Sequence, residues 1–210
     1  MVYPVDLLLE RARAQLMKSA DVKRDTAHKC VEAIVAAAEI TATAFQAGGK
    51  LLLCGNGGSA ADCQHMAAEF VGRFSKTVVR DGLPALALTT DTSFLTAYTN
   101  DVGFEEVFSR QVQAFGKPGD VLVAISTSGN SPNILAAVQA AIAQGMRVIA
   151  LTGAGGKLAA LADIAIEVPS QDTQHIQEAH LAVEHTICDL VEQQVTLSKR
   201  PVQESAGRQS

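Results

Sequence analysis

No run of apolar residues in this 210-residue chain approaches the roughly 20 residues that a bilayer-spanning helix needs. The N-terminus, Met1-Val2-Tyr3-Pro4-Val5-Asp6, also lacks the basic segment and following apolar stretch of a signal peptide. We therefore expect a cytoplasmic protein with no membrane partner.

Basic charge is also scarce. The chain has 17 Lys and Arg against 22 Asp and Glu, and its formal net charge is −5. Broad nucleic-acid binding needs clustered Lys and Arg, so we predict no nucleic-acid partner. An anionic ligand would have to be held by local dipoles and a few side chains rather than by a general positive field.

The four cysteines, Cys30, Cys54, Cys63 and Cys188, form no CxxC pair. Cytosolic thiols usually stay reduced and are often buried as small apolar groups. We predict four buried, free thiols and assign them no chemistry.

The chain does contain short apolar runs that alternate with helical patterns, and 48% of its residues are hydrophobic. We predict strands at 51–54, 85–88, 121–125, 147–151 and 164–168. Helices are predicted at 60–71, 92–99, 104–115, 132–144, 157–162 and 174–197. Such alternation indicates a parallel sheet covered on both faces. The fold class is therefore α/β, a three-layer, flavodoxin-like sandwich with a five-stranded parallel sheet.

Helical periodicity over residues 5–47 adds two helices before the first strand, which is more than one sheet needs. We predict that the N-terminal segment 1–48 supplies contacts for an oligomer. A single domain is expected over 1–198, and the polar tail 199–210 is expected to be flexible.

Two Ser/Gly-rich segments each follow a predicted strand: Asn56-Gly57-Gly58-Ser59 and Ser126-Thr127-Ser128-Gly129-Asn130-Ser131. Hydroxyls and backbone N–H groups at the start of a helix suit a bound anion. Ser59 and Ser131 are the expected N-caps, and Pro132 fits the first helical position. Neither a GxGxxG motif nor a Walker lysine is present, which disfavours dinucleotides and nucleoside triphosphates. The segments favour a small phosphorylated ligand; a tight turn and a solvent loop are the alternatives.

His65 and Glu69 follow the first segment at a spacing of four, which places them on one helix face. Imidazole and carboxylate groups bind Zn²⁺ and transfer protons. The spacing alone favours an ordinary surface pair, and the position of the pair shortly after the first segment makes the two interpretations about equal.

Taken together, these segments resemble the sugar isomerase (SIS) family and, within it, the bacterial phosphoheptose isomerases. The resemblance covers residues 5–196. Further matching pieces are Gln64-His65, Glu69, Arg73-Phe74, Asn100-Asp101, Phe108-Ser109-Arg110-Gln111, Gly119-Asp120-Val121-Leu122, Leu151-Thr152-Gly153, Ile176-Gln177-Glu178 and His185. The resemblance implies an aldose–ketose isomerase that converts sedoheptulose 7-phosphate to D-glycero-D-manno-heptose 7-phosphate, for ADP-heptose and lipopolysaccharide synthesis.

The resemblance also implies roles for individual residues. Glu69 and His185 would be catalytic, moving a proton between C1 and C2 through an enediol(ate), with the direction of each transfer left open. Zn²⁺ would be held by His65, Glu69, Gln177 and His185, although a metal-bound carboxylate is a poorer free base. Substrate would contact Asn56, Gly57, Gly58, Glu69, Asn100, Asp101, Ser126, Thr127, Ser128, Ser131 and Gln177. The assembly implied is a homotetramer.

Two positions fit less simply. Relatives often have Arg where this chain has His175, and Arg73 is either a ligand contact or a cation at a helix end.

Two other functions remain open at this stage. Some SIS relatives are non-catalytic regulators that bind the replication initiator protein, but those lack the matching Glu and His that this chain retains. An isomerase of another phosphosugar is the second alternative, because nothing in the residues measures sugar length.

Overall fold

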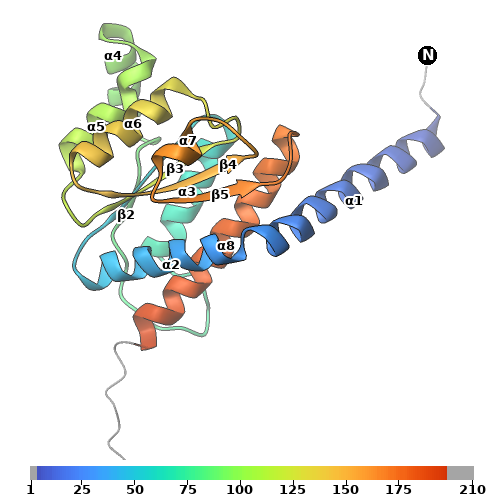
Figure 1. Ribbon diagram of the computed structural model, residues 1–210, viewed down its shortest axis with the longest axis horizontal. Coiled ribbons are helices and arrows are strands. Elements are labelled where there is room, and N and C mark those ends of the chain that lie inside the picture. Colours follow the sequence, from blue (N-terminus) through green and yellow to red (C-terminus); the bar gives the residue numbers. More distant parts are fainter. Residues whose placement is uncertain (1–3, 198–210) are drawn as a thin grey trace, which may run out of the picture.

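A computed structural model describes residues 4–197, and Figure 1 shows their arrangement. The strands are β1 (Leu51–Gly55), β2 (Ala85–Ala87), β3 (Val121–Ser126), β4 (Arg147–Gly153) and β5 (Ile164–Val168). The helices are α1 (Val5–Lys29), α2 (Val31–Gln46), α3 (Gly58–Val71), α4 (Thr92–Asp101), the short 3₁₀ helix η1 (Phe104–Glu106), α5 (Val107–Phe115), α6 (Pro132–Ala143), α7 (Leu158–Leu161) and α8 (Thr173–Leu197).

The five strands form one parallel sheet in the order β2-β1-β3-β4-β5. This confirms the predicted flavodoxin-like fold class. The strand order changes direction between β1 and β3. In parallel sheets of this kind, the loops after the two strands at such a point run to opposite faces, and ligands bind between them at the carboxyl ends of the strands. Both Ser/Gly-rich segments begin at that edge of the sheet, directly after β1 and β3.

Alternation along the strands builds two cores. Leu51 and Leu53 of β1 belong to the core beneath α2, α3 and α8, whereas Leu52 and Cys54 belong to the core beneath α5 and α6. Side chains of a strand point alternately to opposite faces, so the apolar runs are buried on both sides. Both faces of the central strands are therefore packed with apolar side chains, and we expect the functional site at the ends of the strands.

All four cysteines are buried and free, as predicted. Burial raises the pKa of the Cys54 thiol to about 12. A thiol with that pKa is not a nucleophile at neutral pH.

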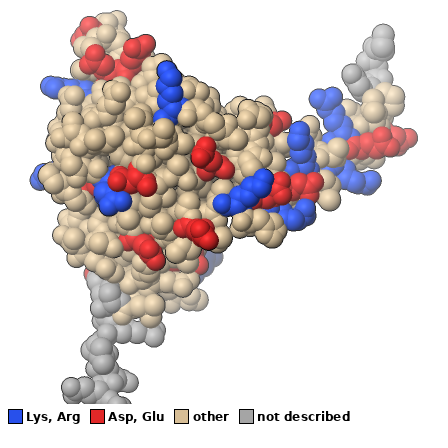
Figure 2. Space-filling view, in the orientation of Figure 1, with Lys and Arg blue, Asp and Glu red and all other residues tan. Residues whose placement is uncertain are grey.

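Helix α1 extends away from the sandwich, while α2 packs beside α8 (Figure 1). The first half of α1 exposes Val5, Leu7, Leu8, Leu9 and Leu16, whereas Val22 near its end is buried. On the face shown in Figure 2, Lys and Arg are interspersed with Asp and Glu along α1 and lie scattered elsewhere. No helix among residues 4–197 combines the length and apolarity needed to cross a membrane.

A few boundaries differ from the predicted ones. Helix α3 begins at Gly58 with Gly57 as its N-cap, so the expected N-cap Ser59 lies inside the helix. The positive φ of Gly57, 58°, lets the chain turn into the helix before Ser59. The predicted helix 104–115 is divided into η1 and α5 at Glu106. The predicted tail 199–210 lies outside the described residues.

Candidate functional site

The crevice at the sheet reversal is bridged by two asparagines. Asn56 follows β1, and Asn133 lies in the first turn of α6, which follows β3. Each Nδ2 donates to the other residue's Oδ1 at 2.9 Å. This reciprocal amide pair ties the two strand–loop–helix units together where their predicted ligand segments begin.

The second segment gathers its hydroxyl groups around the start of α6. Ser126 Oγ lies 3.0 Å from Ser131 Oγ and 3.5 Å from Ser128 Oγ. Ser131 is the N-cap and Pro132 the first helical residue, as predicted, although the Ser131 side chain makes no capping bond. The hydroxyl therefore stays available to a ligand, beside the positive end of the helix dipole.

Gly129 fixes the shape of this loop. Its φ is +63°, and a Cβ there would lie 2.8 Å from both Gly155 O and Thr152 Oγ1. Its carbonyl accepts hydrogen bonds from Lys157 N and Leu158 N, each at 3.0 Å. The loop is thus held against the segment that follows β4 by contacts that leave no room for a side chain.

Helices α3 and α8 bring together three of the four predicted metal ligands. His65 Nε2 lies 2.7 Å from His185 Nε2 and 3.6 Å from Glu69 Oε1. Candidate ligand atoms of these three residues all lie within 4.8 Å of one another. His65 is exposed, while Glu69 and His185 are half-buried, so the cluster is open to a ligand.

The residues fit the implied metal. Nitrogen ligands at about 2.0–2.1 Å from tetrahedral Zn²⁺ would lie roughly 3.3 Å apart. The separations of His65 from His185 and from Glu69, 2.7 and 3.6 Å, lie on either side of that value. Two imidazoles and a carboxylate are ordinary zinc ligands. His185 is also supported by the ring of Phe74, whose centroid lies 5.9 Å from that of the imidazole.

Gln177, the fourth predicted ligand, lies in the N-terminal part of α8 and packs against the start of α3. A Cβ added to Gly58 would come within 2.6 Å of Gln177 Oε1 and Cδ. The absence of a side chain at position 58 therefore leaves room for this amide. Gln177 precedes His185 by eight residues, or about 12 Å along the helix axis, so the structure does not bring it together with the other three.

Other predicted residues lie apart from this cluster or make different contacts. Asn100 and Asp101 are exposed on the last turn of α4, where Asn100 Nδ2 donates to Asp101 Oδ1 at 2.9 Å. Figure 1 shows α4 at the margin of the molecule, beyond α5. Arg73 is exposed just after α3. His175 is buried on α8 near Asp172 and Glu178.

Sequence reasoning missed two carboxyl groups near the cluster, the buried Glu184 and the half-buried Asp62. Glu184 is fully buried, and no hydrogen-bond partner is present for either carboxylate oxygen. Burial, and secondarily the charge of Asp62, raise the pKa of Glu184 to about 9. Burial also raises the pKa of Asp62, which His65 partly opposes. The sequence shows only that Glu184 precedes His185. The burial of Glu184 could not be predicted, because it depends on how α3 and α8 pack together.

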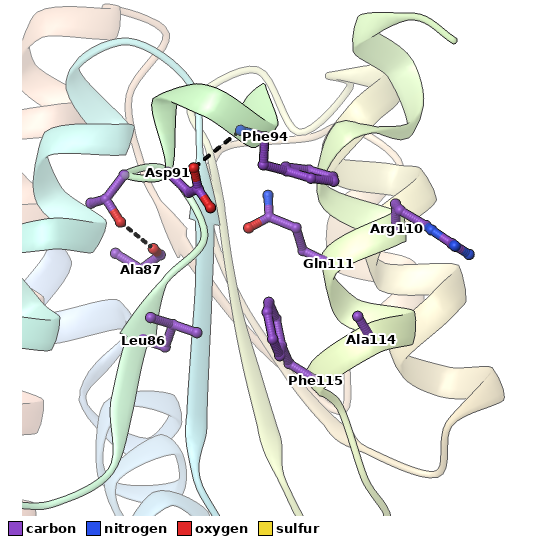
Figure 3. Close-up of a pocket in the computed structure, with 9 residues that line it drawn as sticks. Leu86, Ala87, Asp91, Phe94, Arg110, Gln111, Ala114 and Phe115 are labelled. Carbon is purple, nitrogen blue, oxygen red and sulfur yellow. Dashed lines mark hydrogen bonds between the residues drawn. The ribbon is translucent and has the colours of Figure 1, made fainter. Parts of the chain in front are cut away.

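A separate hollow lies between β2, α4 and α5. Leu86, Phe94 and Phe115 surround a cavity of about 260 Å³, and the side chain of Arg110 points away from it (Figure 3). Its lining includes none of the predicted site residues, so we do not assign it to the catalytic site.

Known proteins share the sequence of this chain over most of its length. Residues 16–153 match the SIS domain family. A phosphoheptose isomerase from Roseiflexus sp. (strain RS-1) is 54% identical over 179 residues, which cover 85% of this chain and 90% of that protein. One from Rhodospirillum rubrum is 57% identical, covering 78% of this chain and 86% of that protein.

A solved structure gives the same result. The structure of phosphoheptose isomerase from Neisseria gonorrhoeae is 49% identical and superposes with a TM-score of 0.83, covering 89% of this chain and 99% of that one. The chain therefore belongs to the SIS-domain proteins and, among them, to the phosphoheptose isomerases, a family of phosphosugar isomerase enzymes.

Proposed function

We propose that this enzyme interconverts sedoheptulose 7-phosphate and D-glycero-D-manno-heptose 7-phosphate, the step that supplies heptose for ADP-heptose and lipopolysaccharide synthesis. The observation that carries the proposal is the convergence of His65, Glu69 and His185 between α3 and α8. A serine-rich anion loop follows β3 at the edge of the sheet where α3 also begins. The names of the relatives support the substrate class.

The serine loop would hold the phosphate. Its ligands would be the hydroxyl groups of Ser126, Thr127, Ser128 and Ser131, together with backbone N–H groups at the start of α6. Asn56, Gly57, Gly58 and Gln177 would line the opened sugar next to α3. Asn100 and Asp101 would contact sugar hydroxyls.

Proton transfer would be carried out by Glu69 and His185. One removes the proton from the carbon beside the carbonyl, and the other protonates or polarises oxygen as the enediol(ate) forms. Their side chains approach the cluster from α3 and α8, so a substrate carbon between them could be reached by both. The reverse reaction exchanges the two roles.

Zn²⁺ is the cofactor that we propose, held by His65, Glu69, Gln177 and His185. When bound, it would polarise the carbonyl and enediolate oxygens as a Lewis acid. The convergence of His65, Glu69 and His185 supports this assignment.

We further propose a cytoplasmic homotetramer. Two helices support self-association, because α1 exposes a series of apolar residues and α4 has no buried residue. Exposed apolar surface of this kind is typical of interaction sites.

A coupled assay with sedoheptulose 7-phosphate, arabinose 5-phosphate and fructose 6-phosphate, with and without added Zn²⁺, tests the proposal. We expect turnover of the heptose phosphate and its loss in Glu69→Gln and His185→Gln, while circular dichroism stays unchanged. His28→Gln, at an exposed position on α1, is the control. Turnover of none of the sugars would favour a non-catalytic SIS regulator. Turnover of only one of the shorter sugar phosphates would show that this sugar, and not the heptose phosphate, is the substrate.

A further inference from the structure

The C-terminal end of α3 is capped by a buried arginine from the loop that follows it. The last carbonyls of a helix have no intrahelical partner. Arg80 donates to Glu69 O from Nη2 at 2.8 Å, and to Phe70 O from Nη1 at 2.8 Å. The Arg80 side chain is only 3% exposed, so these bonds are shielded from water.

The same guanidinium ties this cap to α8. Arg80 Nε donates to Glu192 Oε1 at 2.8 Å, and the Glu192 side chain is 2% exposed. Glu192 also accepts hydrogen bonds from Phe74 N at 3.2 Å and Ser75 N at 2.9 Å. One ion pair therefore joins the end of α3, the loop after it and the C-terminal part of α8.

One end of this clamp contacts a proposed catalytic residue, and the other contacts a residue that packs against the second one. Arg80 binds the carbonyl of Glu69 itself, and Glu192 binds the backbone of Phe74, whose ring packs on His185. The two helices are separate elements, and their reacting side chains are 116 residues apart in sequence (185 − 69). A displacement of one helix along the other would change the distance between Glu69 and His185.

A contribution to stability is a weak explanation for such a pair. Replacing a buried ion pair with apolar side chains of similar volume is often neutral or stabilising. Apolar side chains, however, could not donate to two helix carbonyls and to a carboxylate at once. Lysine could not either, because its donors lack the planar fork of arginine.

We propose that Arg80 and Glu192 are positioning residues for the isomerisation, and that their clamp sets the separation of Glu69 from His185. This inference rests on the proposed function for its catalytic readout. The clamp touches neither the serine loop nor the sugar-lining glycines. Its loss should therefore lower kcat and zinc affinity with little change in KM.

The test compares Arg80→Lys with Arg147→Lys. Arg147 also pairs through Nε, with Asp163 Oδ1 at 2.9 Å, but it is exposed and belongs to β4 rather than to α3, α8 or the loop between α3 and β2. We expect Arg80→Lys to lower kcat and zinc affinity by roughly 10- to 100-fold, the usual effect of losing a group that orients metal ligands. Zinc affinity is measured by competition with a chromogenic chelator, without turnover. Arg147→Lys should change neither quantity.

The double variant Arg80→Met/Glu192→Met keeps the test decisive if Arg80→Lys folds poorly, because it leaves no buried charge unpaired. It should fold and show the same losses per folded molecule. Unchanged kcat and zinc affinity in folded Arg80→Lys or in the double variant would overturn the inference. So would a rise in KM with kcat preserved. Absence of turnover in the unmodified enzyme would instead refute the proposed function. The zinc affinities of the variants would still test whether Arg80 and Glu192 position the metal ligands.

Discussion

Acid should destabilise this protein through one buried histidine, His180. It is fully buried on α8, and its Nε2 lies 3.2 Å from Thr152 O, to which it must donate. Nδ1 is also buried and has no hydrogen-bond partner in the structure. Burial lowers the pKa of His180 from 6.5 to about 4, against a smaller opposing effect of the Thr152 hydrogen bond.

The direction of the change in stability with pH follows from proton uptake. His180 is protonated below about pH 6.5 in the unfolded chain, but only below about pH 4 in the folded chain. Stability is therefore complete above pH 6.5 and is lost as the pH falls toward 4. Linkage gives a loss of about 2 kcal/mol between pH 7 and pH 5, rising to about 3.4 kcal/mol below pH 4.

Urea unfolding at pH 7 and pH 5, at one protein concentration and with chelator present, measures this loss. Other groups also titrate, so the informative quantity is the difference from His180→Gln, which cannot take up the proton. We expect the variant to lose about 2 kcal/mol less than the parent between the two pH values. His28→Gln, at an exposed position, should behave like the parent. Equal losses in the parent and His180→Gln would refute the reasoning.

Three further predictions concern other parts of the site. Gly58→Ala should lower turnover at least about tenfold with little loss of stability, because its Cβ would displace the flexible amide of Gln177 rather than backbone; kinetics and thermal unfolding check this. Ser131→Ala should raise KM for the sugar phosphate roughly tenfold with kcat preserved, since it removes one hydrogen bond to a charged group; an unchanged KM would exclude Ser131 from the phosphate site. Burial raises the pKa of Glu184 from 4.5 to about 9, so stability present below pH 4.5 is lost as the pH rises toward 9. Between pH 6 and pH 8, the free energy of unfolding measured with urea should fall by about 3 kcal/mol less in Glu184→Gln than in the parent. An equal fall in the two proteins would contradict the raised pKa.

Much of the fold could be predicted from local patterns. The apolar runs of β1 and β3 are buried on both faces, which is why they lack a polar face and read as parallel strands. Parallel topology then places the segments after β1 and β3 at one edge. The start of α3 was misplaced because the positive φ of Gly57 is set by its loop, and composition shows only that a glycine allows it.

The site was predictable only in part. The spacing of His65 and Glu69 predicts a shared helix face, and their ion-pair distance of 3.6 Å agrees. No spacing rule brings His185 to His65 across 120 residues, and only the family resemblance did so. Arg80 and Glu192 carried no local signal, because their importance arises from burial between α3, its following loop and α8.

The order of the elements has a consequence for biosynthesis, because α8 follows all five strands of the sheet. While the protein is being made, α3 and the sheet can begin to fold before the partner imidazole His185 is added. Contacts between such distant segments form late, because a long loop must close first. A nascent chain that has not reached α8 therefore has His65 and Glu69 but lacks the second imidazole, and the cluster assembles only after the sheet has been synthesised.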